Sequence, residues 1–97
     1  MKQYVIIARD GIDEKALDRR METRPTHLAG ASVLKANGNF IIGGAMLNEA
    51  GQMEGSVMIL QFETDEAFNN WYNNEPYIIN GVWKTIEVKP FKVANVL

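Results

Sequence analysis

The side chains most able to do chemistry lie between Arg20 and His27. His27 is the only histidine of the chain, and Arg20 and Arg24 precede it. The spacings of four and three residues would place all three on one stripe of a continuous helix. A neutral imidazole can take up a proton, and guanidinium groups bind carboxylate, phosphate or phenolate. The segment therefore predicts an acid–base site for a small anionic ligand.

A simpler interpretation of the same residues stays open. Arg20 and Arg24 would then be solvated helix arginines paired with Asp or Glu. In that case His27 would be a helix-start residue on a partly buried face, with no part in chemistry. Residue types alone do not separate the two interpretations, because short motifs often occur without the function they suggest.

Pro25 predicts an interruption of the first helical segment. The residue before a proline is pushed away from helical angles, so we expect pieces at 13–22 and 25–36, or one helix with a break. Proline is favoured at the first position of a helix. His27 would then lie near the positive end of a helix dipole, which disfavours the charged imidazolium.

Glu75 and Tyr77 form a second candidate group, on either side of Pro76. A carboxylate at position 75 could accept a hydrogen bond from His27, orient its ring and stabilise its charge during proton transfer. Alternatively, Glu75 is an exposed loop residue. The Tyr77 ring could belong to the core while its hydroxyl faces a pocket.

Composition limits the classes of function. The 97 residues predict one domain, 1–97, and the net charge of −2 without a basic run argues against a nucleic-acid partner. No cysteine is present, and one histidine without spaced carboxylates predicts no metal site. Gly43-Gly44 lacks the spacing of a phosphate loop, so no cofactor is expected. No stretch has the length of a membrane span or signal peptide, which predicts a cytoplasmic protein.

The order of hydrophobic patterns predicts an α+β fold. Strands are expected at 4–9, 40–46, 56–63 and 81–91, with Gly38 ending the first helix and Thr64 or Asp65 capping a second that runs to about residue 73. The order β-α-β-β-α-β is that of a ferredoxin-like domain, with four antiparallel strands and both helices on one face. Several strands are apolar on both faces, so a second copy is expected to cover the sheet.

Motifs along nearly the whole chain resemble the YCII-related family. The segment from Arg20 to Leu28 resembles its Arg-xxx-Arg-Pro-x-His-Leu signature, with every named position present. Glu75-Pro76-Tyr77 with Gly81-Val82 resembles its Asp-Pro-Tyr-x-x-x-Gly-Val segment, and Lys89-Pro90-Phe91 resembles its ending. Tyr4-Val5-Ile6 and the stretch from Gly38 to Gly44 resemble its first two strands, with Ala45 where the family has proline.

The resemblance implies a dimeric α/β-barrel with a His–Asp site in a cleft, where Glu75 stands in for the aspartate. It also implies a cofactor-free lyase or isomerase for small aromatic or lactone compounds. His27 and Glu75 would be catalytic, and Arg20, Arg24 and Tyr77 would bind substrate. The expected partners are a second copy, or a higher oligomer, and a small anionic ligand, with no membrane. The alternative is a non-catalytic ligand-binding or assembly protein whose site has decayed.

Overall fold

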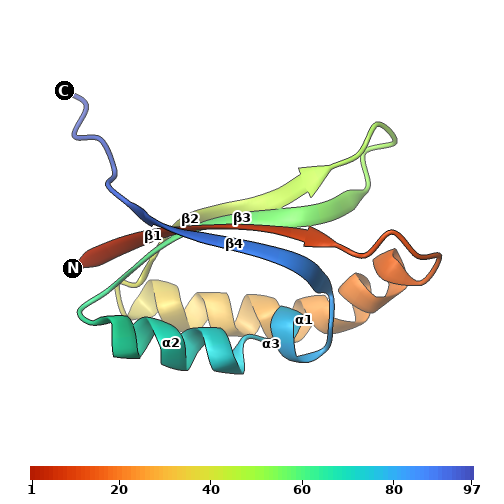
Figure 1. The fold of residues 1–97 in the computed structure, drawn as a ribbon, viewed down its shortest axis with the longest axis horizontal. Helices are drawn as coiled ribbons and strands as arrows, with labels where there is room; N and C mark the ends of the chain where they lie inside the picture. Colours follow the sequence, from red (N-terminus) through yellow and green to blue (C-terminus); the bar gives the residue numbers. More distant parts are fainter.

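The computed structural model describes residues 1–97 as one sheet with helices on one side (Figure 1). The elements in chain order are β1 (Lys2–Asp10), α1 (Ala16–Ala36), β2 (Phe40–Leu47), β3 (Met53–Phe62), α2 (Asp65–Asn74), α3 (Pro76–Ile79) and β4 (Trp83–Phe91). The β-α-β-β-α-β order expected from the sequence is confirmed. The short helix α3, between α2 and β4, is an addition that the sequence patterns did not indicate.

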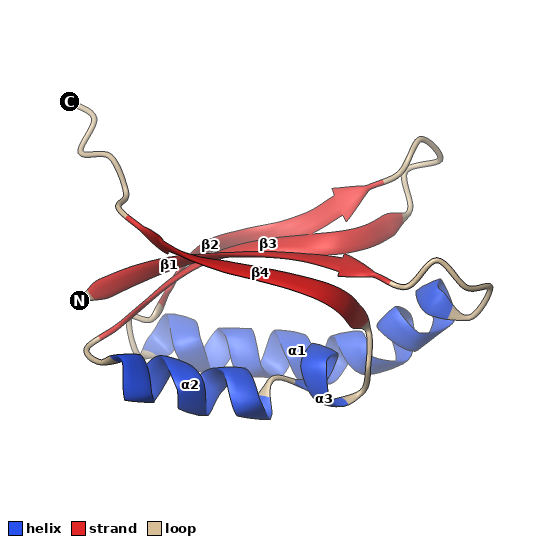
Figure 2. Ribbon diagram, viewed as in Figure 1, coloured by secondary structure: helices blue, strands red, loops and turns tan.

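The four strands form an antiparallel sheet in the order β2-β3-β1-β4. All helices lie under one face of this sheet, and the opposite face is uncovered (Figure 2). This arrangement is the ferredoxin-like α+β fold. The two central strands, β1 and β3, carry most of the buried residues of the sheet.

The core follows from the alternation of side chains along the central strands. Tyr4, Ile6 and Ala8 of β1 are buried, as are Met58, Leu60 and Phe62 of β3. The register pairs Tyr4 with Leu60 and Ile6 with Met58, so apolar residues face the helices from both strands. From α2, Phe68 is buried against them, with its ring stacked on Tyr4 at 4.2 Å.

The prediction that Pro25 interrupts the first helix is wrong. Helix α1 is continuous over 21 residues and contains Pro25. Proline removes one backbone donor from the helix, but packing of a common face can outweigh that loss. Here the buried residues of α1 are Arg20, Thr23, His27 and Leu34, which share such a face. His27 therefore lies well inside the helix, and the argument from a nearby positive helix end no longer applies.

Helix ends elsewhere follow the expected sequence signals. Gly38 has φ of +78°, in the region that favours glycine, just after α1. Thr64 is the N-cap of α2, and its hydroxyl accepts from the Ala67 N–H at 3.1 Å. These residues fix where α1 ends and where α2 begins.

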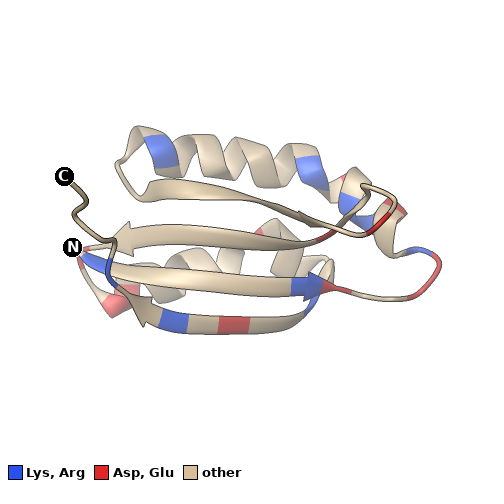
Figure 3. Ribbon diagram, turned by 90° about the horizontal axis from the view of Figure 1, so that it is seen from above, with Lys and Arg blue, Asp and Glu red and all other residues tan.

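The uncovered sheet face is apolar at its centre. Val5, Ile7, Val57 and Ile59 are half-buried there, and Ile42 of the edge strand β2 is 61% exposed. Seen from above, charged residues lie at strand ends and on β4, and the middle of the sheet carries none (Figure 3). None of the helices has both the length and the apolar character needed to cross a bilayer.

Candidate active site

A cavity of about 100 Å³ opens between α1 and the inner face of the sheet. Its walls come from α1, β2, β3 and α3, so segments distant in sequence meet there. The polar members are Arg20, Arg24, His27, Ser56 and Tyr77, and the larger apolar members are Leu28, Phe40, Met53 and Met58. A mostly apolar cavity with a few convergent polar groups is the usual form of a small-molecule site.

One wall of the cavity depends on the absence of a side chain at Gly43. A Cβ there would lie 3.1 Å from the Phe40 ring and 3.2 Å from the Val57 carbonyl oxygen. The strand pairing also shifts between Phe40 and Ile42. The missing side chain at Gly43 thus allows a close approach of the Phe40 ring to the strand beside the cavity.

His27, which lines the cavity, forms a buried pair with Glu75, which does not line it. Nδ1 of His27 lies 2.5 Å from Oε1 of Glu75, and the side chains are 10% and 4% exposed. An ionised carboxylate can only accept, so Nδ1 would carry the shared hydrogen, and in a neutral ring Nε2 would be the nitrogen with the free lone pair. Glu75 Oε1 also accepts from the Tyr77 N–H at 3.1 Å, which caps α3. Two groups, the His27 ring and the Tyr77 N–H, therefore hold this carboxylate oxygen in place.

Aromatic contacts hold the His27 ring in one orientation. The ring stacks on Tyr77 with centroids 3.9 Å apart and planes 10° from parallel. Trp83 approaches it edge-on at 6.1 Å. A ring held by a hydrogen bond and two packing contacts cannot rotate freely, so its unshared nitrogen keeps a fixed position.

Arg20 is neither solvated nor free to hold a ligand with its terminal nitrogens. Its Nη1 contacts both carboxylate oxygens of Asp10, at 3.0 and 3.1 Å, and its Nη2 donates to Ser56 Oγ at 2.8 Å. Both side chains of the ion pair are 3% exposed. Burial raises the pKa of Asp10, and the nearby Arg20 guanidinium offsets this only in part. Arg20 also lies over the Tyr77 ring, 4.8 Å from its centroid.

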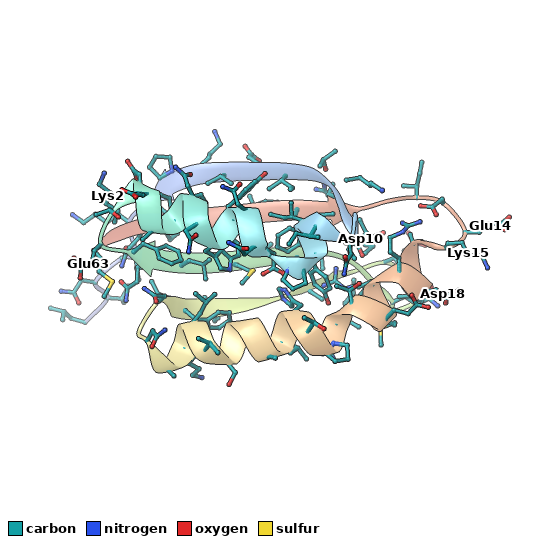
Figure 4. The ribbon with its side chains drawn as sticks, turned by 90° about the horizontal axis from the view of Figure 1, so that it is seen from below. Lys2, Asp10, Glu14, Lys15, Asp18 and Glu63 are labelled. Atoms are coloured by element: carbon teal, nitrogen blue, oxygen red, sulfur yellow. The ribbon has the colours of Figure 1, made fainter.

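Asp10 stands apart from the other acidic residues of this region. It closes β1 and lies among the inner side chains, whereas Glu14 and Asp18 lie at the exposed tip of the molecule (Figure 4). Asp10 and Ser56 were missed by the sequence analysis. Their positions could have indicated them, because both are polar residues at core-facing positions of strands whose other core-facing residues are apolar.

Arg24 is the cavity arginine without a counterion. It lines the cavity and is half-buried, and none of the ion pairs in the structure involves it. Its guanidinium keeps its donors for a ligand. The structure therefore separates two arginines that the sequence analysis treated alike.

The remaining polar groups of the cavity are the hydroxyls of Ser56 and Tyr77 and the Nε of Arg20. Ser56 Oγ accepts from Arg20 Nη2 and from Trp83 Nε1, the latter at 3.2 Å. The Tyr77 hydroxyl and the Arg20 Nε are buried without a hydrogen-bond partner. Burial also raises the pKa of Tyr77 above its ordinary value, which keeps the hydroxyl protonated. No cluster of three His, Cys, Asp or Glu side chains stands close enough to bind a metal ion.

Comparison with solved structures finds proteins with a similar fold. A 5-chloro-2-hydroxyhydroquinone dehydrochlorinase from Burkholderia phenoliruptrix, in complex with 2,5-dihydroxybenzoquinone, has a TM-score of 0.80 at 24% identity, covering 95% of each chain. A dimeric ferredoxin-like protein of unknown function from Jannaschia has a TM-score of 0.59 at 15% identity, covering 96% of this chain and all of the other. These likenesses support the ferredoxin-like fold.

Sequence comparison gives the family. The model of the YCII-related domain matches residues 2–92. Protein YciI of Escherichia coli is 38% identical over 95 residues, covering 92% of this chain and 95% of that protein. An uncharacterized protein of Haemophilus influenzae is 35% identical over 96 residues, with the same coverage. The chain therefore belongs to the YCII-related family.

Proposed function

We propose that this protein is a cofactor-free lyase or isomerase that moves a proton on a small anionic substrate. The observation that carries the proposal is the buried pair that Glu75 forms with His27, which lines a cavity that also holds an unpaired arginine. His27 would take the proton with Nε2 while Glu75 holds Nδ1. Arg24 would bind the substrate anion. Arg20 would position the site through Asp10 and Ser56, with only its Nε left for the substrate.

The charged groups of the site suit the proton transfer that a lyase and an isomerase share. Removal of a proton from carbon leaves an electron pair, which either expels a leaving group from the neighbouring atom or is reprotonated elsewhere. The first outcome is a lyase reaction and the second an isomerisation. A charge partner for the imidazole and a cation for the substrate are the groups that both outcomes require. The dehydrochlorinase of the same fold is an enzyme of the first kind by its name.

The Arg24 side chain should decide anion affinity. Arg24→Ala removes the free guanidinium of the cavity, so binding of a small aromatic carboxylate such as benzoate should weaken about tenfold or more. Arg24→Lys keeps the charge without the two-pronged geometry and should recover only part of the loss. Isothermal titration calorimetry gives the affinities.

Arg19 supplies the control for that measurement. It lies on the same helix, is paired with Asp13 at 2.7 Å, and does not line the cavity. Arg19→Ala should leave benzoate binding unchanged. Equal affinity in Arg24→Ala and the unaltered protein would show that Arg24 belongs to the solvated helix surface.

One observation favours the alternative, a ligand-binding protein without turnover. Glu75 caps α3 through the Tyr77 N–H, so its burial has a structural reason besides catalysis. Glu75 also occupies the place of the family's aspartate. A binding protein would keep its affinity for anions when the His27–Glu75 pair is altered, because Arg24 alone would hold them.

Substitutions of Glu75 separate the two functions. Glu75→Gln keeps the size but loses the charge that supports a protonated His27, so turnover should fall, by less than for loss of His27 itself. Glu75→Asp restores the family residue and should retain or raise turnover. Turnover would be followed by NMR as uptake of deuterium from solvent by enolisable cyclic ketones and lactones. No change in either variant would favour the binding protein.

We also propose that the protein is a homodimer formed by the uncovered sheet faces. Ile42 lies on that face beside its register partner Ile59 and is 61% exposed. A lysine in such an apolar interface is costly, so Ile42→Lys should shift the protein toward monomer by about tenfold or more in dissociation constant. Solved relatives of this fold include dimers.

Ile79 offers a matched control because it is 62% exposed but lies on α3, on the helix side. Ile79→Lys should leave the oligomeric state unchanged. Sedimentation equilibrium at micromolar concentrations measures both. A monomer for the unaltered chain, or equal behaviour of the two variants, would contradict a dimer through the sheet.

A further inference from the structure

We infer that the Ser56 hydroxyl is a fixed hydrogen-bond donor to the ligand and selects small compounds that carry a carbonyl or phenolate oxygen. The inference rests on the proposed function, which places the ligand in the cavity beside His27. It adds to that function the requirement that the ligand carry an acceptor oxygen. Ser56 is 2% exposed and lines the cavity together with Arg24 and His27.

The direction of the Ser56 hydroxyl follows from its neighbours. A serine oxygen has two lone pairs and one hydrogen to donate. Arg20 Nη2 at 2.8 Å and Trp83 Nε1 at 3.2 Å both point hydrogens at this oxygen, and neither nitrogen can accept one. Both lone pairs are therefore in use, and the hydroxyl hydrogen needs an acceptor elsewhere.

No group of the protein supplies that acceptor. The hydrogen bonds of the Ser56 side chain are the two in which its oxygen accepts. Both carboxylate oxygens of Asp10 accept from Arg20 Nη1, and no hydrogen bond joins Asp10 to Ser56. Because an unpaired buried donor is costly, a cavity ligand with an acceptor oxygen would gain by meeting it. The Arg20 cation also polarises the hydroxyl and strengthens it as a donor.

A second hydroxyl of the same wall is also unused. Tyr77 is 1% exposed, and its hydroxyl has no partner. Its ring contacts both His27 and Arg20, so the hydroxyl belongs to the same group of side chains. Two free donors near one imidazole would favour a ligand whose oxygen carries negative charge.

The donors fit one class of proton transfer. In an enolisable ketone, the C–H bond breaks, the proton goes to Nε2 of His27, and the electron pair forms a C=C bond while the carbonyl becomes an oxyanion. Donors aimed at that oxygen stabilise the charge as it develops. Ligands with only a carboxylate would satisfy Arg24 and leave the hydroxyls unpaired.

The test uses 4-nitrophenol, which ionises near neutral pH and whose phenolate is yellow. The unaltered protein should bind phenolate in preference to phenol, so that the absorbance midpoint of the bound dye moves to lower pH. Ser56→Ala should reduce that preference by about ten- to hundredfold, the range for one hydrogen bond to a charged group. Ser32→Ala removes the chain's other serine, which is exposed on α1, and should change nothing.

Further variants keep the test independent of folding. Ser56→Cys retains a weaker donor and acceptor, so it should fold, as circular dichroism would show, and lose most of the preference. Tyr77→Phe removes a hydroxyl that holds nothing else in the fold and should lower the preference as well. An unchanged midpoint in folded Ser56→Ala or Ser56→Cys overturns the role of Ser56 alone. No binding of either form by the unaltered protein would overturn the proposed function too.

Discussion

His27→Gln should lower turnover by about 10²–10⁴-fold and leave the fold intact, because general acid–base catalysis by one group is typically worth that much. Glutamine is similar in size, and its amide can still donate to Glu75, so the buried carboxylate keeps a partner. What it loses is the ability to take up and release a proton. The loss should appear in kcat, with anion binding by Arg24 preserved.

The measurement pairs rate with stability. Deuterium uptake by enolisable cyclic ketones and lactones, followed by NMR, gives the rate, and thermal unfolding gives the stability. His27→Ala is the informative comparison, since it leaves the Glu75 carboxylate buried at 4% exposure without its imidazole and should be less stable than His27→Gln. Equal exchange rates in His27→Gln and the unaltered protein would remove the support for an enzyme.

The order of the elements along the chain was accessible from the sequence because it depends on local patterns. In β3, Met58, Leu60 and Phe62 alternate with Val57 and Ile59, and the structure buries the first group in the core. Thr64 and Gly38 act through their own neighbours as caps. Such signals need no knowledge of distant segments.

Pro25 shows where local rules fail. The proline predicted a break in the helix, but the sequence does not show what packing offsets the lost backbone donor. Helix α1 is continuous, and Thr23 and His27 on either side of the proline are both buried. The contacts of His27 come from segments far along the chain, including Tyr77 and Glu75.

The different surroundings of Arg20 and Arg24 could be recognised only from the fold. Arg20 and Arg24 share a stripe of α1 and both line the cavity. Only the sheet register shows that Arg20 meets a carboxylate, because Ala8 pairs with Ser56 and Asp10 follows two residues later on the same face. Polar residues at inward strand positions were the available signal, although they do not say which cation they will meet.

Asp10→Asn should therefore have the largest effect on stability of any conservative change near the site. The substitution leaves the Arg20 guanidinium, 3% exposed, without its counterion. Removing one member of a buried ion pair typically costs about 3–5 kcal/mol, because the remaining charge is desolvated and unpaired. For a domain of this size the melting temperature should fall by more than about 12 °C.

A second arginine of α1, Arg19, forms an ion pair with Asp13 of the preceding loop and provides the matched control. Arg19 and Asp13 lie as close together, at 2.7 Å, but are 27% and 49% exposed. Water solvates either charge when the other is removed, so Asp13→Asn should change the melting temperature little. Urea unfolding of both variants under the same conditions tests the difference directly.

The double variant Asp10→Leu/Arg20→Met separates charge from packing. Replacing both partners by apolar residues removes the unpaired charge, and such replacements are often neutral or stabilising. It should recover much of the stability lost in Asp10→Asn while disturbing Ser56, which loses the Arg20 donor. Recovery of stability together with loss of phenolate preference would identify the pair as a positioning device. Equal stability losses in Asp10→Asn and Asp13→Asn would show instead that Arg20 is reached by solvent and free to bind a ligand.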